Sequence, residues 1–302
     1  MLKNNFILAS ITTLFINSPV FSEQIKQLEL GFAFYVGGLH VLDAKAHLIP
    51  QENNKYIFTT YATTRGFTNW TTGFMGKSTS QGILNKDLSV KAQKHTNIST
   101  SYFGDNYSEL SISEKGVKLI RYPDYSEKEI ANLEGNPLAK ANDPVATLIN
   151  TMIQVANTKQ CAKDLVIIAN HFLYKMHILK AKTVTLPTTE YNISHGEVIS
   201  CDLGFIRLDK QKNLSAYNAL NQKSGKKDRS PTVYFKKFNN IPYALPVLIR
   251  ATEKNFGEFY MHLQYVKYGD IVINSPIWDD SNIISKETKD TLQAIPKKLM
   301  SN

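Results

Sequence analysis

The sequence is poor in cysteine and tryptophan, with two of each among 302 residues, and it has no long hydrophobic run after its N-terminal region. A helix that spans a membrane needs about 18 consecutive apolar residues, so none is predicted in the body of the chain. Phosphate-binding loops and dinucleotide-binding fingerprints are also missing from the sequence. These absences argue against a helical membrane protein and against nucleotide-dependent enzymes.

Groups with the spacing of a catalytic or metal site are equally scarce. Ser194-His195-Gly196 lacks the Gly-x-Ser-x-Gly pattern of a hydrolase nucleophile and is interpreted as a turn. His171 and His177 share one face of a strand-like run, but no cysteine or carboxylate cluster lies near them in the sequence. We therefore expect no catalytic residue, no metal site and no cofactor, and we predict that the protein is not an enzyme.

The N-terminus has the pattern of a secretory signal. Lys3 gives a short positive region, residues 6–15 are mostly apolar, and Val20-Phe21-Ser22 resembles a small-residue cleavage site. Residues 1–22 are therefore predicted to be a signal peptide that is cleaved near Ser22. The mature protein is expected to be soluble and periplasmic.

Basic residues outnumber acidic ones, 35 to 26, and the formal net charge is +9. Such an excess attracts anionic partners and is compatible with peripheral contact with an anionic membrane surface. A chain rich in Lys, Asn and Ile, as AT-rich genomes encode, would show the same excess without any function, and both interpretations stay open. Nucleic acid is not an expected partner, because the basic residues are scattered and the protein is predicted to be exported.

One amphipathic helix is predicted from Asp143 to Asn157. Asp143 is a favourable N-cap and Pro144 a favourable first helical residue. The residues that recur at helical spacing on its apolar face are Val145, Leu148, Ile149, Met152, Ile153 and Ala156, whereas Thr147, Asn150, Thr151 and Gln154 fall largely opposite. The helix either closes one side of a β core, or it plugs a half-open barrel whose interior holds a ligand.

Two cysteines flank the segment after this helix. Cys161 follows the helix, and Cys201 lies 40 residues further on. Two free cysteines are the alternative to a bond between them. In an oxidising compartment a single pair is usually a structural disulfide, which is what we predict.

The remaining chain is typical of short strands separated by turn residues. The strand-like runs are 28–36, 39–49, 55–64, 77–84, 89–96, 107–113, 117–121, 165–169, 172–182, 198–208, 232–238, 245–252 and 258–268. This pattern predicts a mainly β fold, a large curved antiparallel sheet or half-open β-barrel with one packed helix. Residues 23–268 are expected to form a single β-rich domain, and residues 269–302 a C-terminal tail with weak helical character.

Three aromatic residues fall in a glycine-bearing segment that is interpreted as a connection between strands. Phe67, Trp70 and Phe74 would lie together at one end of the sheet. They either cap the end of the core or form an apolar lid over a ligand.

Several features follow one another in a fixed order over residues 27–268. They are Phe34-Tyr35-Val36-Gly37-Gly38-Leu39 with Ala44, Thr64-Arg65-Gly66 with Trp70, Gly76 and Gly82, Asp143-Pro144, Cys161, Phe172-Leu173-Tyr174-Lys175-Met176, Cys201, and Ala244-Leu245-Pro246-Val247. In this order they resemble a bacterial exported family, domain of unknown function 3108. The chain departs from the family at Asp43, where a glycine is usual, and at Asn170-His171, where Asp-Gly is frequent. The resemblance implies an exported β-rich protein and carries over no catalytic residue.

The favoured hypothesis is a non-enzymatic periplasmic protein that binds an apolar or amphipathic, lipid-like molecule, or a cell-envelope protein, in a concave sheet. Its expected ligand-binding residues are Phe67, Trp70 and Phe74 at the rim, with Leu148, Met152 and Ile153 facing the interior. The alternative is a structural or interaction protein of the envelope with a packed core and no ligand. A hydrolase is a third hypothesis, and it requires a nucleophile and a base within hydrogen-bond reach.

Overall fold

The computed structural model describes residues 25–113, 116–122, 141–161, 165–169, 172–207, 231–253, 257–279, 283 and 285–300. The expected signal peptide of residues 1–22 lies outside these ranges, and so does His171. Within them, no helix combines the length and the apolar character that crossing a membrane demands.

Antiparallel strands make up most of the described chain. Each strand-like run predicted from the sequence overlaps one of the strands β1 to β13. The strands are β1 (Leu28–Val36), β2 (Leu39–Gln51), β3 (Lys55–Thr64), β4 (Met75–Leu84), β5 (Val90–Ser101), β6 (Gly104–Ser113), β7 (Gly116–Tyr122), β8 (Leu165–Ala169), β9 (Phe172–Leu186), β10 (Gly196–Arg207), β11 (Thr232–Lys237), β12 (Ala244–Glu253), β13 (Gly257–Tyr268) and β14 (Ile271–Asn274). The last of these, β14, was not predicted from the sequence.

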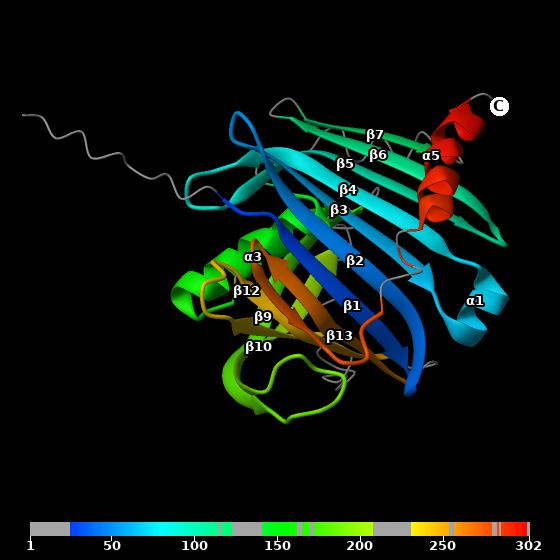
Figure 1. The fold of residues 1–302 in the computed structure, drawn as a ribbon. Coiled ribbons are helices and arrows are strands. Elements are labelled where there is room, and N and C mark those ends of the chain that lie inside the picture. Colours follow the sequence, from blue (N-terminus) through cyan, green and yellow to red (C-terminus); the bar gives the residue numbers. More distant parts are fainter. Residues whose placement is uncertain are drawn as a thin grey trace, which may run out of the picture.

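All the strands belong to one sheet, with the order β7-β6-β5-β4-β3-β2-β1-β13-β12-β11-β10-β9-β8, and β14 pairs with β13. The first and last strands of this order, β7 and β8, do not pair in the described part of the chain, so the sheet curls without closing. Figure 1 shows the two halves of the sheet facing each other, with β1 and β13 at their junction. The predicted fold class, a large curved antiparallel sheet, is confirmed.

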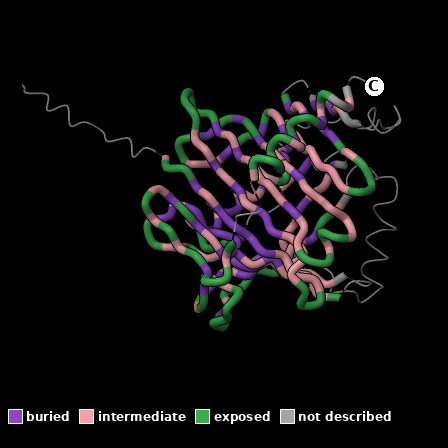
Figure 2. Tube along the Cα trace, turned by 45° about the vertical axis from the view of Figure 1, so that its right-hand side comes forward, coloured by how far each residue is buried: buried purple, intermediate pink, exposed green. Residues whose placement is uncertain are grey.

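Alternation along each strand explains why the sheet is curved around one core. In β1, Leu28, Leu30 and Phe32 point to the concave side and are buried, as a side-chain period of two requires. Their partners on β2 are Leu48, Ala46 and Ala44, which are buried as well. Figure 2 shows the buried segments gathered in the middle of the molecule and the exposed turns at its ends.

The concave side is filled in part by α3 (Pro144–Thr158), the helix that the sequence predicted. Asp143 is its N-cap and accepts a hydrogen bond from the Ala146 amide at 2.7 Å. The helix packs on β5 from one half of the sheet and on β8, β11 and β12 from the other. Because the helix is covered from both sides, Thr147 and Thr151, which fall largely opposite its apolar face, are buried as well.

Two asparagines attach the N-terminal half of α3 to the sheet. The Asn142 main chain bridges to Ile167 of β8, and its side-chain oxygen accepts from the Ala92 amide of β5 at 3.0 Å. Asn150 bonds both main-chain groups of Val90, at 2.7 and 2.8 Å. The helix thereby connects strands from the two halves of a sheet whose end strands do not meet.

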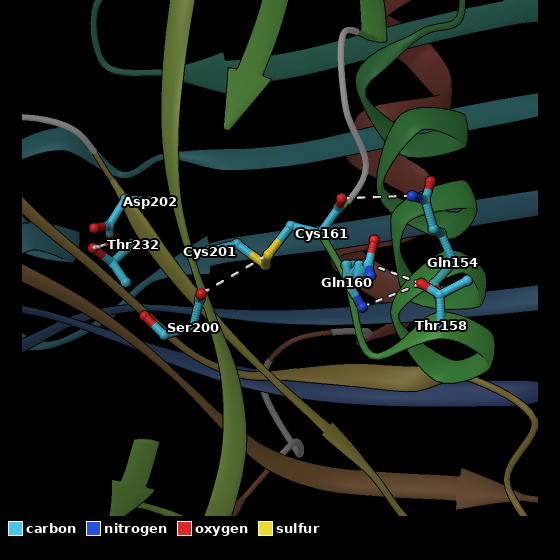
Figure 3. The surroundings of a disulfide bond; sticks show 8 residues. All are labelled: Gln154, Thr158, Gln160, Cys161, Ser200, Cys201, Asp202 and Thr232. Carbon is cyan, nitrogen blue, oxygen red and sulfur yellow. Dashed lines mark hydrogen bonds between the residues drawn. A yellow bond between two sulfur atoms is a disulfide. The ribbon is translucent and has the colours of Figure 1, made fainter. Parts of the chain in front are cut away.

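The other end of α3 is fixed by the predicted disulfide between Cys161 and Cys201 of β10, whose Cα atoms lie 5.9 Å apart. Figure 3 shows the bond beside the last turn of the helix, where the Gln154 side-chain amide donates to the Cys161 carbonyl. Lys159 ends the helix with a left-handed φ of 54°. The helix is therefore held at both ends.

Two further helices lie outside the concave side. The connection at residues 65–74 contains α1 (Gly66–Thr72), a helix that the sequence did not predict. Gly73 is the left-handed C-cap of this helix, and its amide donates to the Asn69 carbonyl at 2.9 Å. This glycine therefore terminates a helix instead of forming part of an irregular loop.

The C-terminal segment, expected as a tail with weak helical character, contains β14 and α5 (Lys286–Met300). Figure 1 shows α5 crossing β4, β5 and β6, on which it packs. Tyr107 points to the convex face of β6 and is buried, as are Leu292 and Ile295 of α5. We therefore place α5 on the convex face of the sheet.

Candidate functional site

Short side chains, most of them polar, cover the concave face of β3, β4, β5 and β6 near the end at which α1 lies. Cross-strand pairing arranges them in two neighbouring rows, one of Thr60, Ser78, Asn97 and Ser108 and the other of Ala62, Gly76, Ser99 and Asn106. Because directly opposed side chains on one sheet face lie about 5 Å apart, each row forms a continuous strip across four strands. The two rows therefore present hydroxyl and amide groups and are not a purely apolar surface.

These two rows line a cavity of about 470 Å3. The space exists because the side chains on this part of the wall are short, and Gly76 has none. Lys77 is the one charged residue among the described lining residues. The Lys77 ammonium group lies 5.5 Å from the centre of the Tyr61 ring. Tyr61 is the cross-strand partner of Lys77, and both side chains are on the convex face. The described lining is therefore uncharged where it meets the cavity.

Phe74 gives the cavity its apolar part. A Cβ atom built on Gly76 would lie 2.8 Å from the Phe74 ring carbon Cζ, so the ring lies directly over this glycine. Phe74 follows α1 after the C-cap Gly73 and is among the lining residues. The cavity thus combines hydrogen-bonding groups on the sheet with an aromatic ring at the α1 end.

A chain of polar groups connects the cavity wall to the N-terminus of α3. The Ser78 hydroxyl lies 3.4 Å from His95 Nε2, and His95 Nδ1 lies 3.2 Å from the Asp143 carboxylate. His95 and Asp143 are buried, whereas Ser78 lines the cavity. The residue types and their sequence of contacts are those of a Ser-His-Asp triad.

Each member of this chain also has a structural role. Asp143 caps α3, and His95 supplies a partner for the second oxygen of that carboxylate. Ser78 lies inside β4, paired on both sides with Thr60 and Asn97, so its amide is part of the sheet rather than a donor for an oxyanion. The arrangement accounts for a buried carboxylate without requiring catalysis.

Beside this chain, the Tyr56 hydroxyl lies 2.8 Å from the Ser80 hydroxyl. Burial raises the pKa of Tyr56, and the neighbouring Asp143 carboxylate raises it further. The phenol therefore stays neutral and acts as a hydrogen-bonding group of the wall. It forms part of the boundary between the polar rows and the packed core.

The structure separates the six residues that the sequence assigned to a ligand. Met152 and Ile153 are buried in the core and Leu148 packs against it, and none of the three lines the cavity. Phe74 does line it. Phe67 and Trp70 lie on α1 with their rings 5.8 Å apart and are largely exposed.

Sequence reasoning missed the polar rows themselves. The signal was present in β4, where Gly76, Ser78, Ser80 and Gly82 recur at every second position, the spacing that places them on one face. Two exposed aromatic residues in the turn between β5 and β6, Tyr102 and Phe103, were also missed. In the described part of the chain, no group of three His, Cys, Asp or Glu side chains could hold a metal.

No family model and no curated protein matches the chain. Among solved structures, it is similar to a beta-barrel-like protein of domain of unknown function DUF1849 from Brucella abortus, at 7% identity and a TM-score of 0.45, over 82% of this chain and 99% of that one. A complex of MucB with MucA(peri) is similar at 7% identity and a TM-score of 0.13, over 80% and 88%. Both likenesses are too slight to transfer a function, so the resemblance to domain of unknown function 3108 is carried by the sequence features alone.

Proposed function

We propose that this protein is a non-enzymatic binding protein of the periplasm that holds an amphipathic molecule in the concave cavity of β3 to β6. The observation that carries the proposal is the cavity itself, about 470 Å3 beside the core of buried apolar side chains. This volume lies within the range of small-molecule sites, about 300–1,000 Å3. A scaffold with a fully packed interior would have no such space.

The lining indicates the class of ligand. Two rows of hydroxyl and amide groups offer donors and acceptors to uncharged polar atoms, and Phe74 and Ala62 offer apolar contact. A purely apolar chain would leave the polar rows without partners, which costs free energy. A molecule with an uncharged polar part and an apolar part, such as a lipid-like amphiphile, satisfies both.

The disulfide supports the proposed location. A bond between Cys161 and Cys201 persists in oxidising compartments and is rare in the cytosol. Together with the signal-like N-terminus, it favours export to the periplasm. Membership of domain of unknown function 3108 is part of the proposal and rests on the motif order described above.

The proposal is tested by identifying what the purified protein carries. Protein isolated from the periplasm would be extracted with organic solvent, and the extract would be compared by mass spectrometry with that of the variant Ser99→Phe, which fills the cavity. We expect an amphiphile in stoichiometric amount from the wild type and little from the variant. Gln81→Phe, on the exposed convex face of β4, is the matched control and should carry as much ligand as the wild type.

A hydrolase is the second candidate, because Ser78, His95 and Asp143 stand in the order of a triad. A fluorophosphonate probe decides between the two, since it labels serines that a neighbouring base activates. We expect no labelling of the folded wild type above that of Ser78→Ala. Labelling that Ser78→Ala and His95→Gln both abolish would establish bond-breaking chemistry and contradict a purely binding function.

A further inference from the structure

Four large aromatic side chains project into solvent at the end of the sheet where the cavity lies. Phe67 and Trp70 belong to α1, and Tyr102 and Phe103 form the turn between β5 and β6. Their exposed fractions are 70%, 75%, 69% and 84%. Single exposed apolar residues are ordinary, but four aromatic ones on two adjoining segments indicate a contact surface. These four residues are called the aromatic rim.

The two segments of the aromatic rim are fixed against each other. The Tyr102 amide donates to the Thr72 carbonyl at the end of α1, at 2.9 Å. The Tyr102 ring lies over Gly73, within 2.6 Å of where a Cβ atom would stand. A left-handed glycine with φ of 54° therefore serves two purposes here, ending α1 and admitting the ring of the neighbouring turn.

The aromatic rim adjoins the cavity. Phe74 lines the cavity and follows α1 after a single residue, and Ser99 and Asn106 line it within a few residues of the turn at Tyr102. A ligand that enters or leaves at this end of β3 to β6 passes beside the rim. Whatever the rim contacts is thus placed next to the proposed binding site.

We propose that the aromatic rim docks on the surface of a lipid bilayer, so that the cavity exchanges its amphipathic ligand with the membrane. This inference rests on the proposed function and adds the partner. Trp, Tyr and Phe rings prefer the boundary between headgroups and acyl chains, where their apolar bodies are buried and their polar edges stay wet.

Charge favours a membrane as the partner. Residues 66–76 and 98–104, which carry the aromatic rim, contain no charged side chain, so no ion has to be dehydrated when they enter the interface. The chain as a whole has a formal charge of +9, which attracts the anionic lipids of a membrane surface. An uncharged aromatic tip on a basic protein combines a hydrophobic contact with long-range attraction.

Flotation with lipid vesicles tests the proposal on the full mature protein. Vesicles of phosphatidylcholine with a minor fraction of phosphatidylglycerol would be mixed with wild type and with Trp70→Ala/Phe103→Ala. We expect the wild type to float with the vesicles. The affinity of the double variant for the vesicles should be lower by a factor of about 10 or more. Leu179→Ala/Phe205→Ala, exposed apolar residues on β9 and β10, is the matched control and should bind like the wild type.

Tryptophan emission supplies a second readout, because the chain has two tryptophans. In Trp278→Phe the emission reports Trp70 alone, and vesicles should shift it to shorter wavelength. In Trp70→Phe it reports Trp278, which stacks on Tyr265 with ring centroids 6.1 Å apart, and no shift is expected. A shift of Trp278 without one of Trp70 would overturn the proposal.

The outcomes separate this inference from the proposed function. If the wild type carries an amphiphile but does not bind vesicles, or if the aromatic variant binds them equally well, docking by the aromatic rim is wrong and the binding function stands. If the wild type binds vesicles through the rim but carries no ligand, contact with the membrane stands, and both the binding function and the ligand exchange are wrong. A dimer in solution that Phe103→Ala abolishes, without vesicle binding, would assign the rim to a second copy and overturn docking.

Discussion

Asn150 acts at the residue scale as a substitute for a missing strand neighbour. Its side-chain amide bonds both the N–H and the C=O of Val90, as a residue on an adjoining strand would. Asn142 does the same for the Ala92 amide. The first residues of β5 lie beyond the part of β5 that pairs with β6, which begins at Lys94. These two side chains therefore satisfy backbone groups that would otherwise be buried without partners.

Replacing Asn150 by alanine should destabilise the protein more than the loss of one small side chain normally does. The change leaves the Val90 amide and carbonyl without partners, and we expect the free energy of unfolding to fall by about 2–3 kcal/mol. Urea denaturation monitored by circular dichroism measures the loss. Asn85→Ala removes an exposed side-chain bond to Ser89 and should cost less than about 0.5 kcal/mol. Equal losses in the two variants would contradict this role for Asn150.

The burial of His262 should make the stability of the protein depend on pH. Its Nδ1 lies 2.6 Å from the Asn192 side-chain oxygen, among the rings of Tyr35, Tyr191 and Tyr260. Burial lowers the pKa of His262 from 6.5 to about 4. Between these values the unfolded chain binds a proton that the folded protein does not, so stability is lost as the pH falls from 6.5 towards 4.

The contribution of His262 is measured by urea denaturation over that pH range. At its lower end we expect a loss of about 1–2 kcal/mol, allowing for solvent screening at a ring that is only partly buried. In His262→Gln, which retains a donor and does not titrate, the dependence on pH should be flatter by that amount. An unchanged dependence would show that His262 is not the group responsible.

At the scale of elements, α3 is a brace between the two halves of the sheet. Asn142 and Asn150 attach its N-terminal half to β5 and β8, and Cys161 attaches its end to β10. Its apolar residues fill the space between the halves. The helix therefore stands in for the pairing of β7 with β8 that would close a barrel.

Removing the disulfide should loosen this brace. Cys161→Ser/Cys201→Ser opens a loop whose ends are 40 residues apart, and the chain-entropy estimate for such a loop is about 4 kcal/mol of unfolding free energy. Reduction of the wild type with dithiothreitol should destabilise it by a similar amount and leave the double variant unchanged. A variant as stable as the oxidised wild type would show that the helix is held by its other contacts alone.

The contact between Gly76 of β4 and the Phe74 ring leads to a prediction about ligand binding. In Gly76→Ala the new methyl group collides with the Phe74 ring and pushes it towards the cavity. Binding of a fluorescent amphiphile should weaken, whereas thermal stability should change little. Adding Phe74→Ala to Gly76→Ala removes the collision and should restore the cavity space. If Gly76→Ala binds the probe as well as the wild type does, Phe74 does not bound the site.

At the scale of the whole molecule, the concave face in the described part of the chain has a packed part and a part that borders the cavity. The described core occupies the space around α3, where large apolar side chains from both halves meet. The cavity remains at the α1 end of β3 to β6, where the wall carries small polar residues. A curved sheet with one part braced and one part open is suited to holding a molecule without unfolding to admit it.

The sequence predicted the architecture better than the site. Strand period and turn residues were enough for β1 to β13, and Asp143-Pro144 marked the start of α3, because these signals are local. The burial of Thr147 and Thr151 could not be predicted, since it depends on a second half of the sheet that lies far away in the chain. The cavity depends on which short side chains become neighbours across four strands, and that is a property of register rather than of any one segment.

Photo-crosslinking tests the central claim, that the concave cavity holds an amphipathic ligand, most directly. The protein would be loaded with an uncharged amphiphile, a monoacylglycerol analogue that carries a diazirine next to its polar part. It would then be irradiated and digested, and the labelled residues would be located by mass spectrometry. We predict labels on the cavity rows, in peptides that contain Ser78, Asn97 and Ser108, and their loss in Ser99→Phe. Labels confined to the convex face, or unchanged in that variant, would contradict the account.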